Sequence, residues 1–180
     1  MLEAQSQEVV LHFLPAKTAV NFTLGDLIHT IHGAFDLKSG TIHYNPASGV
    51  LAGEVVVDAT SGRSGIGLRD RKMHKEVLES ARYPEMVFFP DHMNANLTGS
   101  GTSNLEVHGT LVVHGDRHEV TIPAQVEMQA SGWKLTAHFV IPYVKWGMKN
   151  PSSYLLRVSE SVEVVVHASG DSPWTAAGAR

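Results

Sequence analysis

Residues 68–90 read LRDRKMHKEVLESARYPEMVFFP and contain the one clear helical pattern of the chain. Apolar side chains at Met73, Val77 and Leu78 recur at nearly helical spacing, so they define one apolar side of a short helix. Pro84 ends the pattern, because the residue before a proline is pushed out of helical geometry. An apolar strand pattern follows directly. A lone helix in the middle of a run of strands predicts a cap over one end of a barrel or sandwich.

The sequence on both sides of this stretch alternates between polar and apolar residues, as half-buried strands do. Val20, Phe22 and Leu24, for example, point one way, and the residues between them point the other way. About eight to ten such strands are separated by turn signals. Consecutive strands usually pair with each other. The sequence therefore predicts an all-β protein: an antiparallel, extended up-and-down β-barrel with a short capping helix inserted midway.

Three finer expectations concern the connections between strands. Residues 38–40 are predicted to form a turn between two short strands. Residues 60–67 are rich in glycine and predicted to form a polar loop that leads into the helix. Residues 118–123 and 125–130 are predicted to form two separate strands.

The composition is that of one ordinary globular domain, with 43% hydrophobic and 18% charged residues in a chain of 180. We assign residues 1–170 to this domain and residues 171–180 to a loose tail. The net charge of −4 disfavours a nucleic-acid partner. No stretch approaches the ~20 apolar residues of an integral membrane helix. The absence of cysteine excludes disulfides and thiolate sites.

Several short motifs recur in a characteristic order. The most specific is Arg69-Asp70, a short helix, Tyr83-Pro84 and then an apolar strand. The other matching pieces are Val20-Asn21-Phe22-Thr23-Leu24, His29-Thr30-Ile31-His32-Gly33-Ala34-Phe35, Gly40-Thr41-Ile42, Val55-Val56-Val57-Asp58-Ala59, Met73-His74, Val77-Leu78-Glu79, Val107-His108-Gly109-Thr110-Leu111, His114-Gly115, Val120-Thr121 and Val162-Glu163-Val164. In this order they resemble the YceI-like, polyisoprenoid-binding proteins with a lipocalin-like barrel. The sequence departs from the commonest members at residues 143–151.

This resemblance implies a barrel with an apolar pore, closed by the helical insertion. It also implies a long apolar ligand, such as an isoprenoid chain, an isoprenoid quinone or a fatty-acid-like amphiphile. The expected function is non-catalytic binding, carriage or sequestration of that ligand, with no cofactor other than the bound lipid. A homodimer is left open.

The resemblance also implies a periplasmic or secreted protein. The N-terminus lacks the basic and apolar regions of a signal peptide. That location is therefore expected if a signal peptide has been removed, and a cytoplasmic location is left open.

Large apolar side chains on the alternating strands and on the helix are the predicted ligand-binding residues. They are Phe22, Leu24, Phe35, Leu37, Met73, Val77, Leu78, Phe88, Leu111, Phe139 and Trp146. A core filled by these side chains is the alternative, since alternation alone does not separate the two. Arg69 and Arg71 are the predicted head-group contacts at the pore mouth. In the alternative, Asp70 caps the helix and the arginines form surface ion pairs.

The eleven histidines suggest a second class of function. His114 and His118 flank a tight turn and are expected to face each other across a hairpin, and His108 and His138 are a second pair expected to approach each other. A zinc site would need three or four such ligands to converge. A histidine-based metal-dependent enzyme and a dry-core structural or stress-response domain are therefore the two alternatives to ligand carriage.

Overall fold

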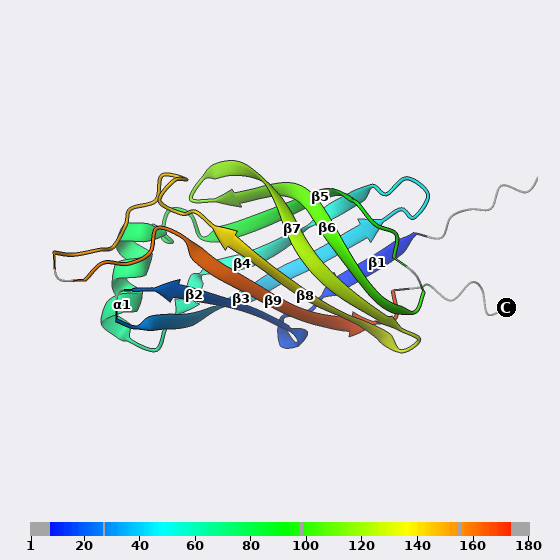
Figure 1. Ribbon diagram of the computed structural model, residues 1–180, viewed down its shortest axis with the longest axis horizontal. Helices are drawn as coiled ribbons and strands as arrows, with labels where there is room; N and C mark the ends of the chain where they lie inside the picture. The colour runs from blue at the N-terminus through cyan, green and yellow to red at the C-terminus, as the bar shows by residue number, and fades with distance from the viewer. Residues whose placement is uncertain (1–7, 27, 98, 155, 174–180) are drawn as a thin grey trace, which may run out of the picture.

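The computed structural model describes residues 8–26, 28–97, 99–154 and 156–173 of the chain. Two predictions concern residues outside these ranges: the nature of the N-terminus, residues 1–7, and the loose tail over residues 174–180. The molecule is an elongated barrel of antiparallel strands with a helical segment at one end, and a short 3-10 helix, η1 (Pro15–Lys17), joins the first two strands (Figure 1).

The barrel is closed and has the predicted up-and-down order. Its strands are β1 (Val9–Phe13), β2 (Thr18–Gly25), β3 (Thr30–Tyr44), β4 (Leu51–Arg63), β5 (Glu85–Met93), β6 (Gly101–Val113), β7 (Asp116–Gln129), β8 (Gly132–Ile141) and β9 (Val162–Asp171). Each strand from β3 to β9 pairs with the next, and β9 pairs with β2 to close the ring. β1 and β2 pair with different parts of β3, so together they occupy one position in the ring. The nine strands therefore fill eight positions.

Three predicted connections are instead parts of continuous strands. β3 runs through residues 38–40, where a register shift between Leu37 and Ser39 replaces the predicted turn. Gly40 is therefore not a turn residue. Glycine is required there because a Cβ would lie 2.9 Å from the Cβ of Phe13 on β1. Similarly, β4 extends through Arg63 into the predicted loop.

β7 is likewise one strand and not two. Its pairing with β8 begins only at Ala124. The preceding residue, Pro123, therefore lies where β7 is paired on one side alone, and its missing N–H interrupts no ladder with β8.

The helical segment consists of α1 (Gly67–Lys72) and a π-helical turn, η2 (Met73–Val77). It ends at Val77 with Leu78 as the C-cap, because Glu79 adopts a left-handed backbone conformation with φ of 46°. The sequence predicted an end at Pro84, several residues too late. Pro84 does not end the helix, since the backbone has already left the helical conformation at Glu79.

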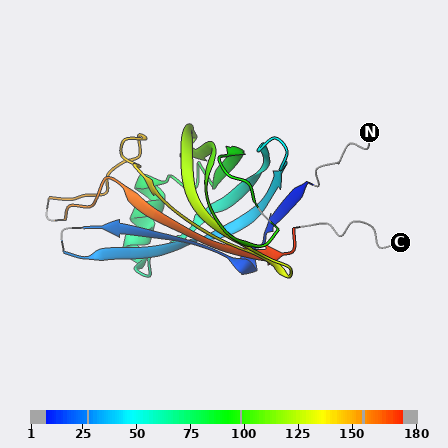
Figure 2. The ribbon, with the colours of Figure 1, turned by 45° about the vertical axis from the view of Figure 1, so that its right-hand side comes forward.

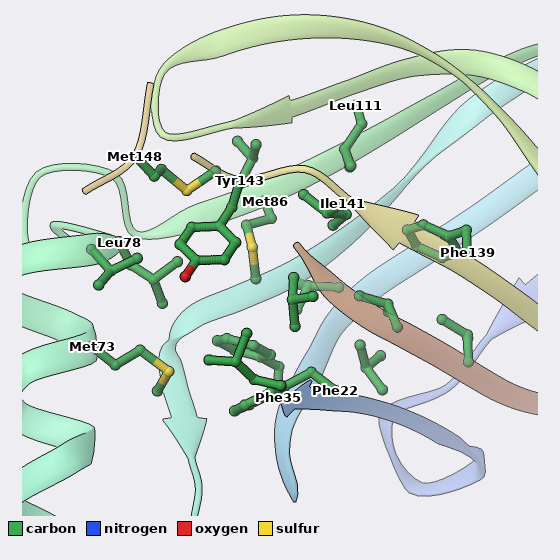
Figure 3. A pocket seen from close by; sticks show the side chains of 18 of the residues that line it. Phe22, Phe35, Met73, Leu78, Met86, Leu111, Phe139, Ile141, Tyr143 and Met148 are labelled. Carbon is green, nitrogen blue, oxygen red and sulfur yellow. The ribbon is translucent and has the colours of Figure 1, made fainter. Parts of the chain in front are cut away.

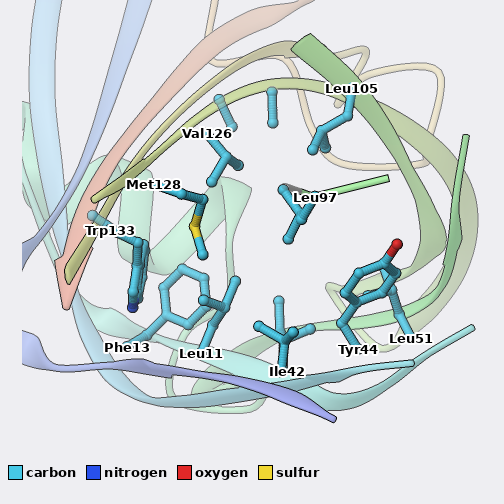
Figure 4. Packing of buried hydrophobic residues seen from close by; sticks show 14 of the residues in the cluster. Leu11, Phe13, Ile42, Tyr44, Leu51, Leu97, Leu105, Val126, Met128 and Trp133 are labelled. Carbon is cyan, nitrogen blue, oxygen red and sulfur yellow. The ribbon is translucent and has the colours of Figure 1, made fainter. Parts of the chain in front are cut away.

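The main packed core lies at the end of the barrel opposite the helix. Phe13 and Trp133 pack with ring centroids 5.1 Å apart. Met128 is almost completely buried beside them, Tyr44 is equally buried across the cluster, and Leu97 packs in from the β5–β6 connection (Figure 4). Figure 2 shows β1 and the end of β9 at this same end, far from α1. Large side chains therefore seal this end of the barrel.

Gly53 offers a test of the strand geometry. It lies within β4 with φ of 103°, and a Cβ there would lie 2.1 Å from the carbonyl oxygen of Thr41. We expect Gly53→Ala to lower the free energy of unfolding by roughly 2 kcal/mol or more, since it adds backbone strain and a collision with β3.

Gly67→Ala is the matched control, because a Cβ at Gly67 meets nothing within 4 Å. It should leave the free energy of unfolding unchanged or raise it by up to about 1 kcal/mol, since alanine favours helix. Denaturant titration measures both. Equal effects of the two substitutions would contradict the strand assignment.

Candidate functional site

A cavity of about 510 Å³ lies inside the barrel, between the packed core and the helical segment (Figure 3). Side chains from all nine strands line it, and nearly all of them are apolar. Its volume falls within the roughly 300–1,000 Å³ of typical small-ligand pockets.

The cavity remains open because side-chain size changes along the barrel. The sealed end contains Trp133, Tyr44 and Met128. The cavity wall is built mainly from valine, leucine and isoleucine, and includes Ala124 and Ala137. An eight-stranded barrel is wide enough to be filled by large side chains or to hold one small ligand. Because the side chains along the cavity wall are mostly smaller than those at the sealed end, this part of the barrel has room for a small ligand.

The helical segment covers the mouth of this cavity. Its lining residues are Leu68, Arg69, Lys72, Met73, Val77 and Leu78. The connection between β8 and β9, residues 142–161, lies beside it and supplies Tyr143, Met148, Pro151, Ser153, Leu156 and Val158. The Lys72 ammonium joins the two, because it donates to the carbonyl of Pro151 at 2.9 Å.

Polar contacts from His74 in η2 and from Glu79, just after η2, hold the helical segment on the barrel. The Nε2 of His74 lies 2.7 Å from the carbonyl oxygen of Gly62 on β4, and its Nδ1 lies 2.9 Å from the hydroxyl of Ser80. A carbonyl only accepts, so Nε2 donates to Gly62 and Nδ1 of a neutral ring accepts from Ser80. Glu79 contacts His114 Nε2 at 2.6 Å, which links the helix end to the β6–β7 turn.

The Arg69-Asp70 pair fixes the start of the helix. Asp70 accepts hydrogen bonds from the backbone N–H and the hydroxyl of Ser64. Arg69 donates to the same hydroxyl at 2.8 Å and to the Ser64 carbonyl at 3.2 Å. The N-cap residue is Ile66, without a side-chain cap. The alternative in which Asp70 caps the helix is therefore wrong, since Asp70 holds the preceding chain instead.

The β8–β9 connection fills a divergence between two strands. The β7–β8 ladder joins only residues 124–129 to residues 132–137, and the two strands separate toward the helical end (Figure 1). Trp146 stacks on His118 of β7 with ring centroids 3.9 Å apart and planes within 4°. Residues 143–151, where the sequence departs from the commonest YceI-like pattern, thus pack against this part of the wall.

Ten of the eleven predicted ligand-binding residues line the cavity. Trp146 does not, because its ring is engaged with His118. Of the predicted head-group residues, Arg69 lines the mouth, whereas Arg71 is exposed and lies outside the lining. Lys72 takes the second cationic position.

The helical pattern could have identified Lys72 as a residue of the cavity mouth, but no pattern identifies the residues of the β8–β9 connection. Lys72 follows Leu68 by four residues and Arg69 by three, so these side chains share one helix side. Tyr143 and Met148 lie outside any periodic pattern, and only the folded connection brings them to the mouth.

The histidines do not assemble as the metal hypothesis expected. His114 pairs with Glu79, and His118 stacks on Trp146. Among the described residues, the group with metal-ligand spacing is Asp91, His92 and His108. The neighbouring residue of His108, Val107, lines the cavity, so alternation directs His108 to the outer face.

A register shift in β5 explains this outer group. The shift between Pro90 and His92 brings Asp91 and His92 opposite His108. Burial acts to raise the pKa of Asp91, but hydrogen bonds from His108 and His92 outweigh it and lower that pKa. The carboxylate therefore stays ionised as the partner of two rings.

Among the described residues, no helix has the length and apolar character needed to cross a membrane. Comparison with protein families matches residues 12–169 to the YceI-like domain. The chain belongs to the YceI-like domain family. A UPF0312 protein of Vibrio parahaemolyticus is 29% identical over 129 residues, which cover 69% of this chain and 65% of that protein. This chain thus aligns with less than two thirds of that relative's length.

Two solved structures share the fold of this YceI-like chain. Burkholderia cenocepacia BcnA superimposes with a TM-score of 0.70 and 16% identity, covering 88% of this chain and 99% of BcnA. A polyisoprenoid binding domain from Saccharophagus degradans, implicated in plant cell wall breakdown, gives a TM-score of 0.70 and 18% identity, covering 94% and 100% of the two chains. These likenesses confirm the lipocalin-like barrel.

Tyr143 provides a pH-dependent test of the mouth of this YceI-like barrel. Burial, and secondarily the charge of Glu160, raises the pKa of Tyr143 to about 12. Its hydroxyl donates to the carbonyl of Ser159 at 2.6 Å. The folded state thus favours the neutral phenol. Its contribution to stability is fully present below pH 10, the ordinary pKa, and is lost as the pH rises toward 12.

We expect Tyr143→Phe to be less stable than the wild type by about 1 kcal/mol at neutral pH, because the hydrogen bond is lost. This difference should shrink as the pH rises above 10. Denaturant unfolding at several pH values measures it, and the other tyrosines are common to both proteins. A difference that stays constant from neutral pH to pH 11 or beyond would show that Tyr143 is not held neutral by the fold.

Proposed function

We propose that this protein binds one long apolar chain in its barrel, without catalysis, and carries or sequesters it. The observation that supports this most directly is the continuous apolar lining of a 510 Å³ cavity in a YceI-like barrel. Transfer of an alkyl chain from water contributes about 0.8 kcal/mol per buried CH₂. Such binding needs an apolar wall more than a set of polar contacts.

The ligand we propose is a single-chain isoprenoid, an isoprenoid quinone or a fatty-acid-like amphiphile. The Saccharophagus degradans neighbour is described as polyisoprenoid binding, which supports the first of these. The chain would pass Phe22 and Phe35 near the helical segment and extend past Phe139 toward the sealed end. A head group with acceptor oxygens would remain near Arg69 and Lys72 at the mouth.

Carriage of an apolar ligand also has a consequence for the location of the protein. We propose a periplasmic or secreted location, where an apolar molecule needs a carrier to cross an aqueous space. A homodimer stays a prediction. The Asp91, His92 and His108 group faces away from the cavity, which supports ligand binding over a metal-dependent enzyme that acts inside the barrel.

Ala137 gives the test of this function. It is buried on β8 and lines the cavity. We expect Ala137→Trp to fill the bore and to weaken binding of a fluorescent fatty acid at least about tenfold, since roughly two buried methylenes already account for that factor. Native mass spectrometry after incubation with an isoprenoid and fatty-acid panel provides a second measurement.

Val140→Trp is the matched control, because Val140 lies on the same strand and is 55% exposed. It should bind the probe like the wild type. Thermal unfolding verifies that both variants fold, and Val107→Trp on β6 repeats the test from another part of the wall. Unchanged probe affinity in a folded Ala137→Trp protein, or no lipid uptake by the wild type, would contradict the proposal.

A further inference from the structure

The mouth of the cavity is surrounded by apolar side chains that face solvent. Ile28 is 75% exposed on the β2–β3 connection, Leu68 is 74% exposed on α1, and Tyr154 is fully exposed on the β8–β9 connection. Ile66 and Leu156 are also exposed large apolar residues. Scattered exposed apolar residues are ordinary, but a group at one site indicates an interaction surface.

These residues belong to three segments that meet at the helical end of the barrel (Figures 1 and 2). The N–H of Ser159 donates to the Gly25 carbonyl at 2.8 Å, which joins the β8–β9 connection to the end of β2. Lys149 pairs with Glu76 at 3.0 Å, which joins the same connection to the helical segment. Leu68 and Leu156 also line the cavity, so the exposed group is continuous with its mouth.

Positive charge is concentrated on the same segments. Residues 26–29, 67–78 and 142–161 contain seven of the 14 lysines and arginines but only four of the 18 aspartates and glutamates. They carry a formal charge of +3, whereas the other 144 residues carry −7. Arg71 and Lys75 are exposed on the helical segment, and Lys145 and Arg157 are exposed on the β8–β9 connection.

We propose that this end of the barrel docks on an anionic phospholipid membrane. Exposed apolar side chains flanked by cations are what an interfacial site requires, because the former insert among the lipids and the latter attract anionic head groups. The negative charge of the remaining protein would turn the cationic end toward such a surface. Docking there brings the cavity mouth to the bilayer, where long apolar molecules reside.

The purpose of docking rests on the proposed function, but the surface itself is tested separately. Flotation of the purified protein with vesicles tests membrane binding. One set of vesicles contains phosphatidylcholine alone, and the other contains phosphatidylcholine with phosphatidylglycerol. The wild type should bind the anionic vesicles more tightly, and high salt should weaken this binding. A triple variant, Ile28→Ser, Ile66→Ser and Tyr154→Ser, should lose at least about tenfold in vesicle affinity.

Two further variants separate charge from a general loss of structure. Arg71→Glu with Lys75→Glu should remove the preference for anionic vesicles. Val50→Ser is the matched control, because Val50 is 51% exposed at the β3–β4 turn, at the opposite end of the barrel. It should bind vesicles like the wild type. Thermal unfolding verifies the fold of each variant.

Binding of a fluorescent fatty acid without vesicles distinguishes the two proposals. None of the residues changed in the docking variants lines the cavity, so these variants should retain probe binding. Wild-type protein that takes up the probe but never binds vesicles would overturn docking alone, and a protein partner would then fit the surface better. Vesicle binding without probe uptake would support docking and overturn the proposed function. Unchanged vesicle affinity in the folded triple variant would also overturn docking.

Discussion

An apolar inner wall that its own side chains do not fill is the constraint on which the rest of this structure depends. Alternation along each strand directs apolar residues inward, and closure of the sheet brings them around one axis. At one end, Phe13, Trp133 and Tyr44 fill the space. Beyond them the wall is made mainly of valine, leucine and isoleucine, and about 510 Å³ remains. Both ends of the molecule must then keep water away from this wall.

The two ends achieve this by different means. The end opposite the helix is sealed by close packing, which gives a fixed boundary. The other end is covered by the helical segment and the β8–β9 connection, which are held by a smaller apolar cluster that includes Val77, Tyr143 and Met148 and by several polar contacts. His74 bonds to Gly62 and Ser80, and Lys72 bonds to Pro151. Segments held by a small apolar cluster and a few hydrogen bonds open at lower free energy than a large packed core. The structure thus favours entry of a ligand at the helical end.

The sequence predicted those parts of the fold that rest on periodicity and failed where contacts between distant segments decide. Strand alternation identified most of the barrel and seven of the proposed cavity residues, and the helical pattern identified three more. Gly40 was misread as a turn signal, because its close approach to Phe13 cannot be seen along the chain. Trp146 was assigned to the cavity by its apolar character, but the divergence of β7 and β8 brings it against His118. Met148 had no pattern to identify it.

The central claim is that the cavity accepts an alkyl chain along its length, and the dependence of affinity on chain length tests it most directly. Titration calorimetry with a series of saturated fatty acids would measure this. Each added pair of methylenes should tighten binding roughly tenfold, since each buried CH₂ contributes about 0.8 kcal/mol, until the chain fills the cavity and the affinity levels off. The heat-capacity change should be negative and should grow with the chain over the same range. An affinity that does not depend on chain length would contradict the account, because the ligand would then be held by its head group outside the barrel.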